Sequence, residues 1–505
     1  MKRPPLWAKQ NAAINFALDR KDAGFGLFME MGTGKSRVMI NVIQHWIADG
    51  ARLGYIVAPI SGMHVWVHEW KLWGGYPVLF VDLQAEGVAG LHKAKDAAAK
   101  GWPVICLINY ESAWQLGHVR KKVMEKGQEV TKLVPTADAL HMTDWDFGVL
   151  DESQKIKTPG AKVSMYFRNR MIKVTEKRAV LTGSAYTKRP LDVWAQVTFA
   201  VGEGHFGKFA DFKSRYSIPH PYIQGAIKEY VNLDHLAQRL SEVCVLLKKE
   251  DVLDLPPALH VKKPIILGAK AKKVYSDLVK ECYAEFEAFE AAEQEKKAEN
   301  PSYRVKTITA DHIFSKTVRM RQLTSGLAIT DGDWDEGQEC FLAAEQLIID
   351  DAKIKALLEI LEDRDKPTLI VVQFDFEEKL VADAIEKEFG KRPKILNGSV
   401  VGAANRHAMV AEMANDTFAI IKEEVGCRAM DMRFADLTVF FSHRPNTEAY
   451  DQMLARNHRG GQTKPITYVH LLAEGTIDYR ILGILESDLE RAKLIEGHWR
   501  DFLAS

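Results

Sequence analysis

Cysteine is scarce in this chain. Its 505 residues include five cysteines, an odd number, and no two of them form a C-x-x-C pair. A disulfide framework requires paired cysteines, and a zinc ribbon requires two C-x-x-C pairs. The sequence therefore argues against both, and free cysteines are typical of a reducing cytoplasm.

Long apolar runs and an excess of charge are also missing. No run of 18 apolar residues occurs, and the N-terminus, MKRPPLWAKQ, lacks the apolar core of a signal peptide. We therefore expect a cytoplasmic, intracellular protein without a membrane partner. The net charge is zero, with 68 basic and 68 acidic residues, which argues against a basic coat over the whole surface but is compatible with a local basic cleft.

What is present is the composition of a globular protein. Hydrophobic residues make up 47% of the chain and charged residues 27%, which is typical of chains that bury a core. A length of 505 residues is sufficient for two or more domains. The sequence therefore predicts a folded, multidomain protein.

Short apolar runs alternate with helical patterns over the first 200 residues. The runs are rich in β-branched residues, end at turn residues, and lie at 54–59, 104–109, 147–151 and 179–182. Such runs indicate buried parallel strands. Their alternation with helices predicts an α/β fold with a doubly wound parallel sheet, in which ligands bind at the carboxyl ends of the strands.

The middle of the chain has a different pattern. Apolar residues at helical spacing over 270–300 predict a long amphipathic helix with a solvated, charged outer face. A second helix is expected over about 309–328 and a loop over 330–339. Strand patterns then return in a second α/β lobe, at 368–374, 418–422, 437–442 and 466–472. Because Pro256 and Pro257 break any helix, we place the domain boundary near 253–260.

Residues 29–36, MEMGTGKS, resemble a phosphate-binding loop whose first glycine is replaced by Met29. A strand pattern precedes the loop and a helical pattern follows it, which is the context that such a loop requires. Backbone N–H groups at the helix start would hold phosphate, Lys35 would neutralise its charge, and Ser36 would ligate Mg²⁺. The alternative is a tight glycine turn without a ligand.

An acidic pair follows another predicted strand. Asp151 and Glu152 come directly after the run at 147–151. Asp151 would hold Mg²⁺ through water, and Glu152 would orient and deprotonate the attacking water. The pair alone would be more simply a surface turn, but together with Lys35 it predicts nucleotide hydrolysis.

Two arginines near the C-terminus complete the predicted chemistry. Arg456 and Arg459 are three residues apart, and Gln452 lies four residues before Arg456. We expect all three to share one helix face, from which the arginines would neutralise charge on a γ-phosphate. The alternative is a solvated helix face.

The order of these motifs is similar to that of the Swi/Snf-type ATPases of the superfamily two helicases, the DNA translocases. MEMGTGKS resembles the family's DEMGLGKT, and LDESQKIK stands where D-E-A-H-x-I-K is expected. AVLTGSAYTKRPLDVWAQVTF is similar to motif III and QMLARNHRGGQ to motif VI. PLWAKQNAAI is similar to the Q-motif, YIVAPISGMHVWVHEWKLW to motif Ia and LIVVQFDFEEKLVADAI to motif IV. The resemblance runs from about residue 5 to about residue 480, and the second half is closest to compact bacterial and phage-type members.

The resemblance implies two RecA-like lobes with ATP between them. Lobe one would comprise residues 1–255, with a helical protrusion at about 200–245. Lobe two would comprise residues 256–505, with a helical insertion at about 268–345 and a C-terminal brace helix at about 476–505.

The resemblance also assigns roles to residues. The catalytic residues would be Lys35, Asp151, Glu152, Arg456 and Arg459. The ATP contacts would be Gln10 on the adenine edge together with Gly32, Thr33, Gly34, Lys35, Ser36, Gln154 and Gln462. Ser36 and Asp151 would hold Mg²⁺. Nucleic-acid contacts, largely to phosphate, would come from Pro59, Ser61, Asn109, Gln373 and Lys422, each of which could equally be structural.

The chain departs from the family pattern at two motifs. Gln154 replaces the histidine of motif II, and we expect activity to survive because glutamine can hydrogen-bond to motif VI or III. Motif V becomes GCRAMDM at 426–432, which keeps Gly426 and has Asp431 where asparagine is expected. This change bears on how ATP is coupled to the nucleic-acid strand.

These observations favour an ATP-dependent translocase on double-stranded or branched DNA. The alternatives are a strand-separating DNA or RNA helicase, and a DNA-binding scaffold with a degenerate motor that lacks productive ATP turnover. Trp66, Trp70 and Trp73 are interpreted as packing residues rather than as platforms for stacked bases.

Overall fold

The computed structural model describes residues 5–20, 24–125, 128–183, 190–219, 227–247, 256–299, 310–329, 333–335, 340–342, 346–362, 364–426, 430–459 and 462–486. These residues form two compact units, one containing the described residues up to 247 and the other those from 256 onward. Within the described part of the chain, no helix has the length and apolar character needed to cross a membrane. The functional division into two lobes stays a prediction.

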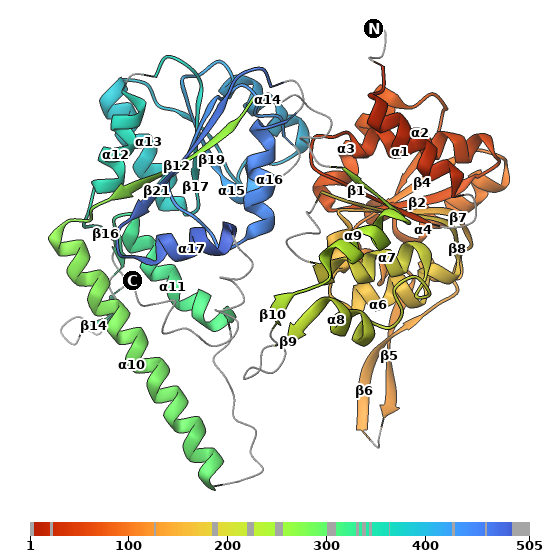
Figure 1. Cartoon of the computed structure of the whole chain (residues 1–505), viewed down its shortest axis with the longest axis horizontal. Helices are drawn as coiled ribbons and strands as arrows, with labels where there is room; N and C mark the ends of the chain where they lie inside the picture. Colours follow the sequence, from red (N-terminus) through yellow and green to blue (C-terminus); the bar gives the residue numbers. More distant parts are fainter. Residues whose placement is uncertain are drawn as a thin grey trace. The chain divides into compact units, whose positions relative to one another are not determined.

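The first unit is built on a seven-stranded parallel sheet (Figure 1). Its strand order is β11-β1-β8-β7-β2-β4-β3. The strands are β1 (Phe25–Met29), β2 (Leu53–Val57), β3 (Leu79–Asp82), β4 (Val104–Ile108), β7 (Trp145–Asp151), β8 (Thr175–Thr182) and β11 (Cys244–Leu247). Because all of them run the same way, the residues after β1, β7 and β8 lie at one edge of the sheet.

Two glycine–aromatic pairs help to define the register of β2 and β7. Gly54 is paired with Phe147 and Tyr55 with Gly148. A Cβ atom on Gly54 would lie 2.1 Å from the Phe147 ring, and one on Gly148 would lie 2.3 Å from the Tyr55 ring. Each glycine therefore accommodates the aromatic ring of the neighbouring strand, and a larger residue at either position would displace that ring.

Helices cover both faces of this sheet. One apolar core packs the inward side chains of α1 (Ala8–Asp19), α2 (Lys35–Ala48) and α3 (Ile60–Trp73) against the strands. The core of the opposite face includes residues of α4 (Leu83–Ala99), α5 (Tyr110–Ala113), α6 (Lys162–Asn169), α7 (Val193–Val201), α8 (Phe209–Tyr216) and α9 (Leu233–Ser241). Consecutive residues of β1 alternate between the cores, since Leu27 belongs to one and Phe28 to the other. The prediction of a doubly wound α/β sheet is confirmed.

Two antiparallel hairpins accompany this sheet. β5 (His118–Glu125) pairs with β6 (Gln128–Pro135), and β9 (Ser217–Pro219) pairs with β10 (Ile227–Tyr230). The segment at 200–245, predicted to be helical, therefore contains strands β9 and β10 besides the helices α8 and α9.

The second unit repeats the architecture on a six-stranded parallel sheet of order β12-β21-β20-β17-β19-β18. The strands are β12 (Ala258–Ile265), β17 (Thr368–Val372), β18 (Lys394–Leu396), β19 (Phe418–Lys422), β20 (Leu437–Phe440) and β21 (Ile466–Ala473). α12 (Ala352–Leu361) and α13 (Asp375–Phe389) pack on one face. The core of the other face includes α10 (Ala269–Glu299), α11 (Ala310–Thr324), α14 (Ala403–Met413), α15 (Glu423–Gly426), α16 (Thr447–Asn457) and α17 (Ile477–Glu486).

The predicted insertion in this unit is helical only in its first part. α10 and α11 correspond to the two expected helices, but the segment up to 345 also contains β13 (Leu327–Ile329), β14 (Asp333–Asp335) and β15 (Cys340–Leu342). β13 pairs with β16 (Gln346–Ile348), and β14 pairs with β15. The expectation of a loop at 330–339 is therefore wrong for β14, because pairing with a later segment overrides the local Gly/Asp signal. Of the predicted brace helix, α17 is observed, and residues 487–505 lie outside the described residues.

Candidate nucleotide site

The glycine loop joins β1 to α2 in the first unit. Gly32 and Gly34 have φ angles of 87° and 90°, a left-handed conformation that residues with a Cβ atom rarely adopt. Gly34 is the N-cap of α2, so the loop ends where the first N–H groups of a helix are available to an anion. A Cβ atom on Gly34 would also lie 2.3 Å from Gln10 Nε2. The loop therefore requires glycine at position 34 for two reasons.

Gln10 attaches the first helix to this loop. Its Nε2 donates to the Thr33 carbonyl oxygen at 3.0 Å, and its Oε1 accepts from the Trp7 N–H at 3.1 Å. The side chain is 1% exposed. Thr33 is held in turn by its own hydroxyl, which donates to the Glu30 carbonyl oxygen at 2.7 Å. Gln10 thus supports the loop, and its contact with adenine stays a prediction.

Lys35 begins α2 and extends back across the loop. Its Nζ donates to the Met29 carbonyl oxygen at 2.8 Å. A Cβ atom on Gly183, the residue after β8, would lie 3.2 Å from the same Nζ. Lys35 is therefore near the carboxyl ends of both β1 and β8. Burial raises the pKa of Asp151 at the end of β7, and the charge of Lys35 opposes that rise. Three adjacent strands therefore contribute residues to one charged site, and the roles assigned to Lys35 and Asp151 stay predictions.

Asp151 is a half-buried residue whose carboxyl group accepts from two donors. Its Oδ2 accepts from Trp66 Nε1 at 2.9 Å, and its Oδ1 accepts from the Glu152 N–H at 3.0 Å. Burial raises the pKa of Asp151 to about 6, and repulsion from Glu152 adds to this, while Trp66 and Lys35 act in the opposite direction. A carboxyl group in such surroundings gains from a nearby cation, so Asp151 fits the predicted role of a Mg²⁺ ligand through water.

Glu152 adopts an unusual backbone conformation. Its φ and ψ are both 50°, the left-handed region, which costs a non-glycine residue roughly 1–2 kcal/mol. Strain of this kind is often found at functional sites. Gln154 Nε2 donates to Glu152 Oε2 at 2.7 Å, and Gln154 Oε1 accepts from Thr182 Oγ1 at 2.8 Å. Gln154 therefore connects the acidic pair to the end of β8, which is the hydrogen bond to motif III that we expected of a glutamine here.

Two residues that the sequence did not assign to the site are in direct contact with Asp151. Trp66, interpreted as a packing residue, is 2% exposed and does pack, but its indole N–H also binds the carboxylate. Tyr110 donates its hydroxyl to the Asp151 carbonyl oxygen at 2.8 Å. The distances in sequence are 85 and 41 residues, so no local pattern reveals these contacts.

The predicted arginines lie in the second unit. Arg456 is in the last turn of α16, which ends at Asn457, and Arg459 follows the helix. The expectation that Arg456 and Arg459 share a helix face is therefore wrong. At the end of the helix, the Arg456 carbonyl oxygen accepts from the Met432 N–H at 3.2 Å and the Asn457 side chain donates to the Ala435 carbonyl oxygen at 3.2 Å.

Gln462, a predicted ATP contact, holds the chain that follows α16. Its Nε2 donates to the Arg433 carbonyl oxygen at 3.2 Å, and its Oε1 accepts from the N–H groups of Thr463 and Lys464 at 3.1 and 3.2 Å. The side chain is 7% exposed. This local role accounts for Gln462 without a nucleotide, so its contact with ATP stays a prediction.

The amino-acid sequence matches the SNF2-related domain over residues 9–325. The chain belongs to the SNF2-related family. Protein p41 of Acyrthosiphon pisum secondary endosymbiont phage 1 is 24% identical in an alignment 498 positions long, which covers 93% of this chain and 93% of p41. YwqA of Bacillus subtilis, whose name refers to an ATP-dependent helicase/translocase, is 23% identical over 500 residues. That alignment covers 95% of this chain but 47% of YwqA.

A solved structure of the same family is also similar. It is the Sulfolobus solfataricus SWI2/SNF2 ATPase core in complex with dsDNA, with 17% sequence identity and a TM-score of 0.42. The comparison covers 99% of this chain and 94% of that one.

The predicted nucleic-acid contacts of this SNF2-related chain have different surroundings. In the first unit, Pro59 is the N-cap of α3, and Ser61 is in the first turn of that helix. Asn109 is 4% exposed, and its Oδ1 accepts from the Ser112 N–H at 2.6 Å. Capping of α5 explains this asparagine without any nucleic acid.

In the second unit, the remaining two predicted contacts lie at the carboxyl ends of neighbouring strands. Gln373 comes directly after β17, and its N–H donates to Glu377 Oε2 at 2.7 Å. Lys422 ends β19 and is paired with Asp375. Burial opposes the charge of Lys422, but the hydrogen bond and charge of Asp375 raise its pKa overall. Asp375 thus stabilises the positive charge of Lys422 at the carboxyl end of β19.

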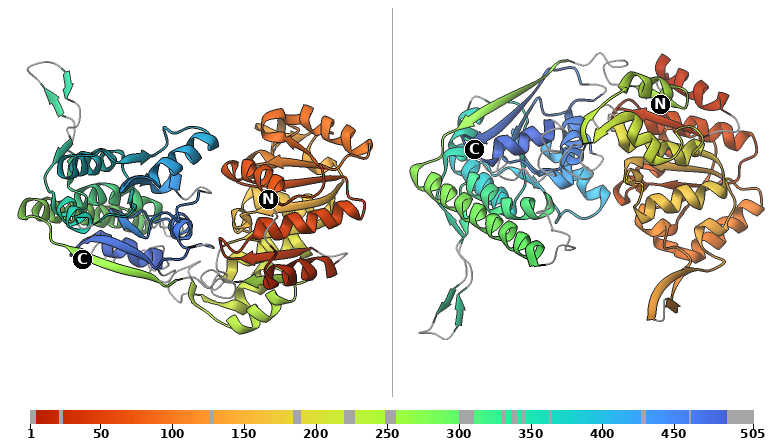
Figure 2. Two further views of the ribbon diagram at one scale, coloured as in Figure 1. Left: turned by 90° about the horizontal axis from the view of Figure 1, so that it is seen from above. Right: turned by 60° about the horizontal axis from the view of Figure 1, so that its bottom comes forward.

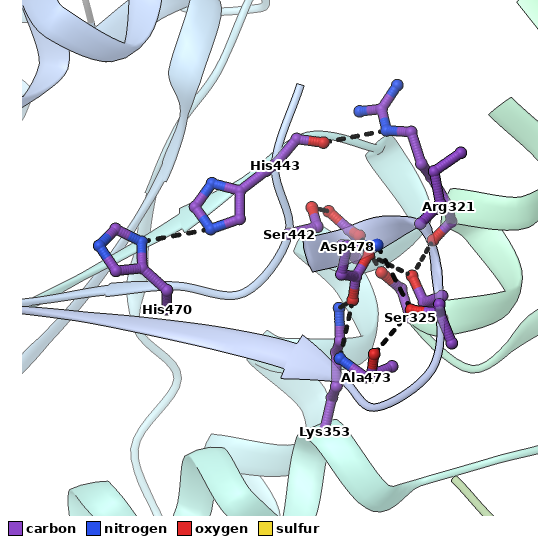
Figure 3. A network of polar contacts seen from close by, with 12 residues as sticks. Arg321, Ser325, Lys353, Ser442, His443, His470, Ala473 and Asp478 are labelled. Carbon is purple, nitrogen blue, oxygen red and sulfur yellow. Dashed lines mark hydrogen bonds and ion pairs between the residues drawn. The ribbon is translucent and has the colours of Figure 1, made fainter. Parts of the chain in front are cut away.

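Buried polar groups gather at this edge of the second sheet (Figure 3). Glu377 is 0% exposed and accepts from Ser325, from Ser442 and from the N–H groups of Gln373 and Phe374. Lys353 and Asp478 form a buried ion pair at 2.6 Å, and Thr324 also donates to Asp478 at 2.9 Å. The network joins α11 of the insertion to α13 and α17.

Arg321 extends this network toward β20. Its Nε donates to the His443 carbonyl oxygen at 2.9 Å, and its guanidinium carbon lies 4.9 Å from the centre of the Phe374 ring. No signal in the sequence marks Arg321, because its partners lie far away along the chain. Arg321 of the helical insertion therefore contacts Phe374, which directly follows Gln373. Gln373 is one of the predicted nucleic-acid contacts.

Proposed function

We propose that this chain is an ATP-dependent translocase that moves on double-stranded or branched DNA. The observation that carries the proposal is the cluster at the carboxyl ends of β1, β7 and β8. There, the charge of Lys35 acts on Asp151, and hydrogen bonds join Asp151 to Glu152, Glu152 to Gln154, and Gln154 to Thr182 of β8. The chain that carries this cluster belongs to the SNF2-related family. YwqA, a relative by sequence, bears a name that refers to ATP-dependent translocation.

We assign the chemistry to the residues of that cluster. The N–H groups at the start of α2 would hold the phosphates of ATP, and Lys35 would exchange its bond to the Met29 carbonyl oxygen for a phosphate oxygen. Glu152 would orient the attacking water and accept its proton. Ser36 and Asp151 would hold Mg²⁺, which would screen the charge of the phosphates.

Arg456 and Arg459 are assigned to the transition state. Charge builds up on the transferred phosphoryl group, and arginine stabilises it through several directed N–H donors. Their different surroundings, one in the last turn of α16 and the other beyond it, suggest separate tasks rather than one shared helix face.

The steady-state ATPase rate tests the proposal. It is measured without nucleic acid and with blunt duplex DNA, single-stranded DNA, a four-way junction and duplex RNA. We expect duplex or junction DNA to stimulate turnover, and we expect displacement of a third strand from a duplex to report translocation. Equal rates under all conditions would overturn the proposal, and displacement of one strand of an ordinary duplex would instead favour a helicase.

A further inference from the structure

The β5–β6 hairpin is a feature of the first unit that the nucleotide chemistry does not use. Each strand has eight residues, a length of about 27 Å. Figure 1 and the right-hand view of Figure 2 show both strands extending away from the sheet and helices of that unit. Such a hairpin has no second layer to pack on and is at best marginally stable in water by itself.

The base of the hairpin is nevertheless firmly attached. The Gly117 carbonyl oxygen accepts from both the N–H and the hydroxyl group of Thr136, each at 2.8 Å. The His118 ring lies 5.6 Å from the ring of His141, which is hydrogen-bonded to Tyr166 at 3.3 Å. The direction in which the hairpin leaves the unit is therefore set by specific contacts.

The half of the hairpin nearest this base carries positive charge alone. Residues 118–122 and 131–135 contain Arg120, Lys121, Lys122 and Lys132 and no aspartate or glutamate. The hairpin's two acidic residues, Glu125 and Glu129, lie in the far half. Arg120 and Lys121 are exposed. In a chain whose net charge is zero, this is a local concentration of one sign on a projecting element.

The backbone register places two of these basic residues at opposite positions. Lys121 is paired with Lys132 across the hairpin. Like charges directly opposite each other destabilise a pair of strands, and this hairpin has no core that would compensate for the repulsion. A partner with closely spaced negative charges would relieve it, and duplex DNA carries one negative charge per about 1.7 Å of helix axis.

We propose that the basic half of the β5–β6 hairpin, which includes the exposed residues Arg120 and Lys121, binds the phosphate backbone of duplex DNA. The inference rests on the proposed function for its choice of partner, and it adds a contact outside the motifs. These contacts are to phosphate, so they increase affinity for any sequence and do not select one. The hairpin increases the affinity for duplex DNA, and it does not take part in ATP hydrolysis.

The test is the salt dependence of binding to a fluorescent blunt duplex, measured by anisotropy on the full chain. The variant carries Arg120→Gln, Lys121→Gln and Lys132→Gln. Each lost phosphate contact lowers the slope of log K against log salt by about 0.9, so we expect a slope smaller by about 2 to 3 and binding weaker by roughly tenfold at low salt. The thermal midpoint should stay level or rise, because the variant removes the repulsion between Lys121 and Lys132.

The matched control is a triple glutamine variant of Lys93, Lys95 and Lys100, exposed residues in or next to α4. It removes the same charge from the same unit, and its slope should equal that of the unaltered chain. A hairpin variant with an unchanged slope, or one that matches the control, would overturn the inference and leave the proposed function intact. A reduced slope with no stimulation of ATPase by DNA would support the hairpin contact and overturn the translocase. Absence of duplex binding by the unaltered chain would overturn both.

Discussion

The two parallel sheets are alike in architecture, but different kinds of residue lie at their carboxyl ends. After β1, β7 and β8 of the first unit lie left-handed glycines, a lysine and the strained Glu152. After β17 and β20 of the second unit lie Glu377 and Ser442, buried and hydrogen-bonded to each other. Glu377 accepts four hydrogen bonds from the protein itself, whereas the Asp151 carboxyl group accepts two and burial raises its pKa to about 6.

This difference separates a site prepared for a ligand from a site that holds the fold together. Backbone strain and a carboxyl group with a raised pKa are costs that a bound cation and phosphate can offset. A carboxylate with four donors is already satisfied, and its removal would leave those donors buried without partners. Changes at the first edge should therefore affect turnover, and changes at the second should affect stability.

The sharpest separation is expected at Lys35. Lys35→Ala removes the charge assigned to the phosphates, so we expect DNA-stimulated ATPase to fall at least 100-fold. The midpoint of urea unfolding should change little. Lys155→Ala, at an exposed position close to the acidic pair in sequence, serves as the control and should keep its turnover. ATPase retained by Lys35→Ala would contradict the assignment of the first edge.

Glu377 tests the opposite edge. Glu377→Ala leaves four buried donors without an acceptor, and we expect the second unit to lose about 3 kcal/mol of unfolding free energy. Urea denaturation measures the loss. Glu388→Ala, in the same helix but exposed, should leave the midpoint unchanged. A stable Glu377→Ala variant would mean that this network is not what holds α11 and α13 together.

Glu423 tests the second edge through the pH dependence of stability. It is buried, and burial raises its pKa to about 7 against an ordinary 4.5, although Gln373 and nearby arginines act in the opposite direction. Because the folded-state pKa is the higher one, the stability that this group contributes is present below about pH 4.5 and is lost as the pH rises through about 7. We expect Glu423→Gln to unfold with a free energy that exceeds that of the unaltered chain by on the order of 2 kcal/mol at pH 8 and by little at pH 5. A pH-independent difference would contradict the raised pKa.

The smallest expected effect concerns Trp66. Trp66→Phe keeps an aromatic ring in the core but removes the donor to Asp151 Oδ2, which raises the pKa of Asp151 further. We expect ATPase at pH 6.5 to fall about fivefold, and the loss to shrink at pH 8, where the carboxyl group is ionised in both proteins. Trp70→Phe, whose indole bonds instead to the Tyr76 carbonyl oxygen, is the control. Equal pH profiles for both variants would leave Trp66 as packing alone.

Much of the fold could be predicted from short stretches of the chain. The eight strands inferred from apolar runs correspond to β2, β4, β7, β8, β17, β19, β20 and β21, and the strand expected before the glycine loop corresponds to β1. Each of these strands has a neighbouring strand on both sides. Strands in such positions are covered on both faces, so their sequence patterns are continuous and apolar. The edge strand β12 escaped prediction because most of its residues are exposed and because His260, Lys262 and Lys263 interrupt its apolar pattern. The short strands β14 and β15 depend on each other for pairing.

The sequence by itself determined which residues could do the chemistry. A glycine loop before a helix, an acidic pair after a strand and the order of the motifs depend on near neighbours, and near neighbours can be read along the chain. Only the tertiary structure decided how those residues are supported. Packing brings together the Trp66 indole and the Asp151 carboxylate, and likewise the Thr182 hydroxyl and the Gln154 amide. Packing also accompanies the end of α16 at Asn457, and strand register pairs Lys121 with Lys132. Hydrogen bonds and like-charge pairs of this kind have no signature in local sequence, because their energy depends on distance in space and not on separation along the chain.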